Sequence, residues 1–200
     1  MPDPLAQLLD GTARTVSAAP DGSLAADLPV QGALLSGSFN PLHAGHERLA
    51  QAASATLGMP VSFELPVANA DKPPLSYAEI ERRLEQFRWR YPVVLSREPL
   101  FVGKADIYPG SVFVVGYDTA ERLVEPRYYG GEAGRDAALA HIRAQGCRFL
   151  VAGRVEEGTF RTLRDIPVPA SAHDLFIELP ESAFRVDLSS TAIRAQLAGE

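Results

Sequence analysis

Two histidines, His43 and His46, stand three residues apart at the start of a helical pattern, directly after a loop rich in turn residues. If the helix begins near His43, both imidazoles share one face of its first turn, beside free backbone N–H groups and the positive end of the helix dipole. Gly37 and Gly45 let the backbone turn and approach a ligand closely. Such a corner attracts phosphate, although a plain strand-to-helix turn with an incidental histidine pair also fits these residues.

A second stretch with anion-binding chemistry lies near the C-terminus. Ser189, Ser190 and Thr191 can cap a helix while they offer hydroxyl and N–H donors to an anion. Arg194 follows one turn later, within reach of a bidentate phosphate contact. Taken alone, a well-capped terminal helix is the better explanation of this stretch.

The apolar pattern between the two stretches predicts the elements that must position them. Strands are predicted at 32–35, 61–65, 93–95, 112–116, 148–152 and 175–179. Helices are predicted at 4–9, 43–57, 76–91, from 118 onward and at 137–145. Because strands that alternate with helices in short units indicate parallel crossovers, we expect an α/β fold: a Rossmann-like, doubly wound parallel sheet in a single domain.

The loops with polar residues follow predicted strands. In a doubly wound sheet the ligand crevice lies outside the carboxyl ends of the strands. We therefore expect the loops at 37–46, 69–72, 116–118 and 153–154 to converge on one cleft.

Composition restricts both the size and the partners of the chain. Two hundred residues, 46% of them hydrophobic, suit one globular domain with a substantial core. The formal net charge of −6 argues against nucleic acid or an acidic membrane surface as a partner. Cys147 is the only cysteine, which excludes an intrachain disulfide and suits a buried strand position in a reducing compartment.

The first thirty residues differ in composition from the rest. We expect 1–30 to be an accessory segment with a short helix and an Ala/Ser/Gly/Pro-rich stretch, and 31–200 to be the main domain. No run approaches the ~20 apolar residues that cross a bilayer, and no basic leader precedes an apolar stretch. We therefore expect a cytoplasmic protein that does not bind membranes; a homo-oligomer is compatible with the sequence.

Two stretches resemble motifs of one superfamily. Gly-Ser-Phe-Asn-Pro-Leu-His-Ala-Gly-His at 37–46 resembles the signature of the nucleotidylyltransferases, whose members include the mononucleotide adenylyltransferases of NAD synthesis. Ser-Ser-Thr-Ala-Ile-Arg at 189–194 looks like their C-terminal Ser-Ser-Thr-x-Ile-Arg motif. The resemblance extends over about 32–197, and residues 64–74 and 127–130 look most like a branch labelled cytidylyltransferase-like.

The resemblance implies roles for the matching residues. His43 and His46 would bind phosphate, with His46 nearest the α-phosphate, while Lys72 would bridge donor and acceptor and Arg194 would hold the leaving pyrophosphate. The implied nucleotide contacts are Gly37, Ser38, Phe39, Asn40, Gly45, Gly116, Asp118, Arg154, Ser189, Ser190 and Thr191.

Some of these residues also fit plainer roles. Lys72 fits an exposed loop lysine, and Asp118 with Glu121 fits the N-cap of a helix. Arg154 fits a solvated loop arginine. Gly-Tyr-Asp at 116–118 resembles a Gly-x-Asp motif of the superfamily at the end of a strand. The sequence departs from the common pattern of the superfamily at Asn40, where many relatives have Asp, and at Tyr117, which is a bulky residue inside this motif.

The reaction implied by the resemblance is transfer of AMP from ATP to a phosphomonoester, with release of pyrophosphate. Nicotinamide or nicotinate mononucleotide is the leading acceptor. Mg²⁺ would arrive with ATP, because no carboxylate cage for a metal is visible in the sequence. No covalent nucleophile stands out, which fits a reaction that depends on positioning and charge stabilisation.

Other functions stay open at this point. CTP could replace ATP, with another phosphorylated alcohol as acceptor. A nucleotide-binding regulatory module would bind without turnover, and a slow ATP hydrolase would need no acceptor. A fragment of a class I aminoacyl-tRNA synthetase is less favoured, because the chain has no Lys-Met-Ser-Lys-Ser loop and no basic tRNA-binding region. Trp89, Tyr128 and Tyr129 could stack on a base, but packing or surface anchoring is favoured for all three.

Overall fold

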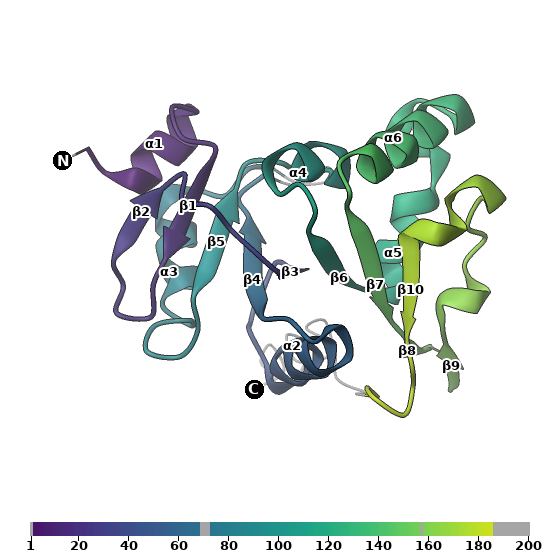
Figure 1. Cartoon of the computed structure of the whole chain (residues 1–200). Helices are drawn as coiled ribbons and strands as arrows, with labels where there is room; N and C mark the ends of the chain where they lie inside the picture. The colour runs from purple at the N-terminus through teal and green to yellow at the C-terminus, as the bar shows by residue number, and fades with distance from the viewer. Residues whose placement is uncertain (1, 69–72, 157, 186–200) are drawn as a thin grey trace.

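A computed structural model describes residues 2–68, 73–156 and 158–185 of the chain. The fold is built on one large β-sheet (Figure 1). Within the described residues this sheet has eight strands in the order β10-β7-β6-β3-β4-β5-β1-β2. The strands are β1 (Thr15–Ala18), β2 (Leu24–Ala26), β3 (Ala33–Ser36), β4 (Val61–Pro66), β5 (Val93–Ser96), β6 (Val112–Gly116), β7 (Arg148–Ala152) and β10 (Phe176–Leu179). From β10 to β5 every neighbouring pair is parallel, so the predicted Rossmann-like α/β sheet in a single domain is confirmed.

Helices connect the parallel strands. They are α1 (Pro4–Asp10), α2 (Ala44–Leu57), α3 (Tyr77–Leu84), α4 (Phe101–Ile107), α5 (Tyr117–Val124) and α6 (Glu132–Ala144), with the 3₁₀ turns η1 (Pro126–Tyr129), η2 (Leu163–Asp165) and η3 (Ala170–Leu175). A separate two-stranded hairpin pairs β8 (Arg154–Glu156) with β9 (Thr159–Arg161). None of the helices in the described part of the chain has the length and apolarity to cross a membrane.

The sheet separates two hydrophobic cores. Ala33 and Leu35 of β3 pack in one core with residues of α1, α2 and α3, whereas Leu34 between them packs in the other with residues of α4, α5 and α6. This alternation follows the two-residue period of a strand. Figure 1 shows α2 on one side of the sheet and α4 with α6 on the other. Helices on both faces explain why the central strands are mostly apolar on both sides.

The N-terminal residues extend the sheet. β1 pairs antiparallel with β5 and with β2, so β5 is an inner strand. α1 packs its Leu5 and Leu8 into the core, as the sequence predicted for a helix there. The strands β1 and β2 were not predicted, because an Ala/Ser-rich segment carries little strand propensity of its own and their pairing depends on distant residues.

Two predicted helix boundaries were wrong, and one helix was not predicted. The helix predicted at 76–91 ends at Leu84, and the chain then turns until Trp89, whose N–H donates to the carbonyl of Pro20 and whose φ is +61°. Asp118 is not a helix N-cap, because α5 already begins at Tyr117 with Gly116 as its cap. Helix α4 was missed since it has seven residues and contains a glycine.

Candidate active site

Residues 37–43 form a loop, the histidine loop, that joins β3 to α2. His43 is the N-cap of α2, and its Nδ1 accepts the N–H of Gly45 at 3.1 Å. His46, in the first turn, accepts the N–H of His43 on its own Nδ1 at 3.3 Å. The two rings stack with centroids 3.7 Å apart, so the expected arrangement of both imidazoles on the first turn of the helix is present.

These hydrogen bonds define the protonation of both rings. An Nδ1 that accepts a hydrogen bond carries no proton, so each neutral imidazole carries its proton on Nε2. Burial, and then the neighbouring His43, lowers the pKa of His46 to about 3. Burial also lowers the pKa of His43, although Glu47 opposes the change. At neutral pH both side chains are therefore uncharged donors through Nε2–H.

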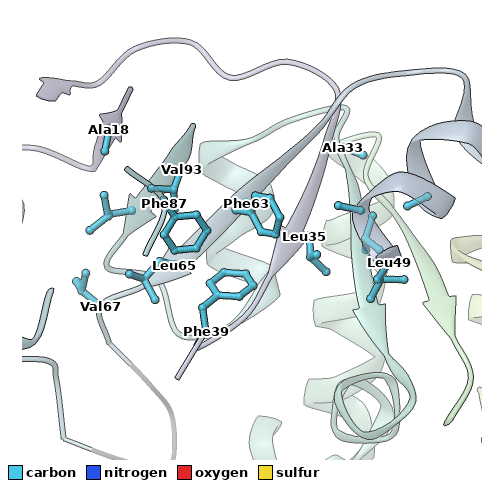
Figure 2. Close-up of a cluster of buried hydrophobic side chains, with 14 of the residues drawn as sticks. Ala18, Ala33, Leu35, Phe39, Leu49, Phe63, Leu65, Val67, Phe87 and Val93 are labelled. Atoms are coloured by element: carbon cyan, nitrogen blue, oxygen red, sulfur yellow. The ribbon is translucent and has the colours of Figure 1, made fainter. Parts of the chain in front are cut away.

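Phe39 supports the histidine loop from the hydrophobic core. The residue is fully buried, and its ring contacts His46, Phe63 and Phe87 edge-on, with centroids 5.1 to 5.4 Å apart. Figure 2 shows Phe39 directed toward the rings of Phe63 and Phe87. Because the whole residue is buried, the Phe39 ring positions His46. Its expected contact with a nucleotide stays a prediction. A Cβ on Gly37 would lie 2.8 Å from the Phe39 ring, so this ring requires glycine at 37.

Helix α3 fastens the same loop. Arg83 donates to the carbonyl of Ser38 at 2.9 Å, and Arg82 donates to the side-chain oxygen of Asn40 at 2.8 Å. Gln86 bonds the loop twice, to the carbonyl of Phe39 at 3.0 Å and to the N–H of Leu42 at 2.7 Å. The loop is therefore held in place by side chains from α3 and from the turn that follows this helix.

Three further predicted residues lie at the ends of two neighbouring strands, β6 and β7. Gly116, at the end of β6, is in register with Ala152 at the end of β7. The carboxylate of Asp118 forms an ion pair with the guanidinium of Arg154, just after these strands. The structure thus brings Gly116, Asp118 and Arg154 together at the carboxyl edge of the sheet.

A cavity of about 570 Å³ opens at this edge beside the histidine loop. Its charged lining residues, Arg83, Lys104 and Arg122, are all basic. The remaining lining is Ser36, Gly37, Ser38, Asn40, Pro66, Val67, Pro73, Leu75, Pro99, Leu100, Phe101, Thr119, Leu123, Tyr128 and Tyr129. A volume of this size suits a small-molecule ligand.

A comparison with protein families decides the relationship. A model of the cytidylyltransferase-like family matches residues 34–196, which is most of the chain. The chain belongs to the cytidylyltransferase-like family. This membership supports nucleotidyl transfer as the general type of reaction. No curated protein matches the sequence.

The cavity of this cytidylyltransferase-like protein contains only part of the cleft predicted from the sequence. Gly37, Ser38 and Asn40 line it. The other predicted site residues that the structure describes are not among its lining residues: Phe39, His43, Gly45, His46, Gly116, Asp118 and Arg154. Tyr128 and Tyr129, for which packing had been favoured, do line it. Trp89 does not, and 76% of it is exposed.

Five predicted site residues lie outside the described part of the chain. They are Lys72, Ser189, Ser190, Thr191 and Arg194. Their roles stay predictions from the motifs.

Within residues 2–68, 73–156 and 158–185, no three His, Cys, Asp or Glu side chains are grouped so that they could hold a metal ion. Binding of Mg²⁺ together with ATP stays a prediction.

Sequence reasoning missed two buried charges at the cavity. Glu64 is fully buried in β4, and Lys104, 2% exposed, lies in α4 and borders the cavity. A glutamate in the middle of the apolar run 61–65 was the available signal, because an unpaired charge there is unfavourable.

Proposed function

We propose that the protein transfers AMP from ATP to a phosphomonoester and releases pyrophosphate, with nicotinamide or nicotinate mononucleotide as acceptor. The observation that carries this proposal is the pair of neutral imidazoles at the start of α2, each with its proton on Nε2. Membership of the cytidylyltransferase-like family supports nucleotidyl transfer as the reaction type.

The histidine pair suits the charge that develops during this reaction. A phosphate oxygen of the acceptor would attack the α-phosphorus in line, so negative charge would build up on the non-bridging oxygens. His46 Nε2–H has no hydrogen-bond partner among the described residues, which leaves it available as a donor to such an oxygen. Since Phe39 and His43 fix the ring beforehand, the donor needs little reorganisation during the reaction.

The cavity suits a phosphorylated acceptor. It lies next to the histidine loop, and its three charged lining residues, Arg83, Lys104 and Arg122, carry N–H groups that suit phosphate oxygens. Two of these charges are compensated, since Arg83 pairs with Glu79 and Lys104 with Glu64. Tyr128 and Tyr129 offer aromatic surface for a planar ring. Mg²⁺, bound to ATP, would supply charge neutralisation of the triphosphate.

The test is pyrophosphate release by the full chain, with ATP or CTP combined with each mononucleotide in the presence of Mg²⁺. His46→Asn keeps a side-chain acceptor for the N–H of His43 but removes the Nε2–H donor. Loss of one such donor should lower kcat about 10²- to 10³-fold. His173→Asn is the matched control. His173 lies on η3, away from the histidine loop, and its Nε2 forms a hydrogen bond with the carbonyl of Val168.

The outcomes separate the functions considered. Release that requires ATP and one mononucleotide, and that falls in His46→Asn but not in His173→Asn, supports the proposal. Release that requires CTP would overturn the donor. ATP consumption without any acceptor would indicate a hydrolase, and ATP binding without any release would indicate a binding module.

A further inference from the structure

A buried polar network borders the cavity through two of its members, Ser36 and Lys104. Glu64 is 0% exposed, and its carboxylate accepts hydrogen bonds from Ser36 Oγ and Ser96 Oγ, each at 2.6 Å. Lys104 Nζ donates to the same carboxylate at 2.5 Å and to Ser36 Oγ at 3.3 Å. The three strands β3, β4 and β5 supply the two serines and the glutamate, so the network spans the carboxyl ends of neighbouring strands.

This pair is a poor choice for a purely structural role. Moving two charges out of water is costly, and apolar residues of similar size often stabilise such a position equally well or better. The buried residues of α4 are Phe101, Lys104 and Ala105, so Lys104 is the charged group that this helix buries. A role in ligand recognition explains why charges are kept here, since Lys104 borders the cavity.

Lys104 has a donor to spare. An ammonium group carries three N–H bonds, and among the described residues only Glu64 and Ser36 accept from Nζ. The Phe101 ring lies against the ammonium, with Nζ 5.0 Å from its centroid, and Phe101 also borders the cavity. The remaining N–H is available to an oxygen atom of a molecule in the cavity.

The charge of the pair determines which oxygen fits. Glu64 cancels the charge of Lys104 at 2.5 Å, so a ligand oxygen on Nζ meets a donor without net positive charge. A carboxylate in that position would lie close to the Glu64 carboxylate in a dry environment, and such like charges repel strongly. A neutral carbonyl accepts the hydrogen bond without this repulsion.

We propose that Lys104, held by Glu64, selects an acceptor with a neutral carbonyl oxygen, such as a carboxamide, over the corresponding carboxylate. The inference deepens the proposed function and rests on it for the choice of ligand: nicotinamide mononucleotide is preferred over nicotinate mononucleotide. Lys104 is then a specificity-determining residue of the acceptor pocket.

The test measures binding of the two mononucleotides to the full chain by calorimetry, and so does not depend on turnover. The wild type should bind nicotinamide mononucleotide about tenfold or more tightly than nicotinate mononucleotide. Glu64→Gln keeps the shape of the side chain but leaves the Lys104 charge uncompensated, so the preference should invert. Asp174→Asn is the control for the lost negative charge, because Asp174 pairs with Arg143 and does not border the cavity.

A second variant separates recognition from folding. Glu64→Leu with Lys104→Met removes both charges and should retain a cooperative thermal transition while the discrimination falls to about twofold or less. If Glu64→Gln leaves the ratio of the two affinities unchanged, if the double variant keeps it, or if the wild type binds neither mononucleotide, the inference is overturned. The proposed function fails by a different result, which is absence of acceptor-dependent pyrophosphate release.

Discussion

Replacement of His46 by asparagine should change how the stability of the protein depends on pH. In the folded protein the pKa of His46 is lowered to about 3, mainly by burial and then by His43. In the unfolded chain this side chain titrates near its usual value of 6.5. Between these two values the unfolded chain binds a proton that the folded protein does not. The stability that depends on neutral His46 is therefore fully present above the unfolded pKa and is lost as the pH falls toward the folded one.

The size of the effect follows from the number of protons. A difference of one proton changes the free energy of unfolding by about 1.4 kcal/mol per pH unit. Between about pH 6 and pH 4 the wild type should lose roughly 2 kcal/mol through His46 alone. Asparagine does not titrate in this range. The free energy of unfolding of the wild type minus that of His46→Asn should therefore fall by the same amount.

The assay is urea denaturation of both proteins at several pH values across this range. Carboxylates titrate in the same window, but their contributions are common to both proteins and cancel in the difference. A parallel series with His173→Asn corrects for loss of a histidine elsewhere. A difference between wild type and His46→Asn that stays constant from pH 6 to pH 4 would show that His46 titrates normally, and would remove the argument for a neutral donor.

Other predictions concern the loop, the buried pair and the metal. Lys104→Met alone should lower the free energy of unfolding by about 3–5 kcal/mol, because Glu64 is then buried without a counter-charge. Adding Glu64→Leu should recover most of this loss. Urea denaturation of both variants measures the two effects. Gly37→Ala should cost about 1–3 kcal/mol and reduce pyrophosphate release, because its Cβ would press on the buried Phe39 ring at 2.8 Å; equal melting temperatures for variant and wild type would contradict it. Chelation of Mg²⁺ should abolish pyrophosphate release without lowering the melting temperature, since the described residues form no metal site that folding could depend on.

The features predicted correctly from the sequence have local causes. Helix α2 ends where glycine at 58 adopts a left-handed conformation with φ of +66°, and it begins at His43. Both signals lie within a few residues of the boundary that they define. The central strands were recognised for a similar reason, because runs such as Val112–Gly116 are apolar on both faces.

The features that were missed depend on contacts between distant residues. Lys104 and Glu64 are 40 residues apart, and no local pattern connects a helical lysine with a strand glutamate. The turn at Trp89 depends on the carbonyl of Pro20, which lies on a different segment. In the same way, no sequence pattern connects Arg83 and Gln86 with the histidine loop. Their hydrogen bonds to the carbonyls of Ser38 and Phe39 are visible only in the structure.

The strand order also has a consequence for how the chain is made. β1 needs β5 as its partner, and β3, which carries the histidine loop, has β6 on its second side. During synthesis both early strands must wait until distant residues leave the ribosome. A nascent chain that ends before Val112 therefore leaves one edge of β3 unpaired next to the histidine loop. Such long-range pairing slows folding, so the step at which β6 joins β3 is the point where the growing protein is most exposed to aggregation.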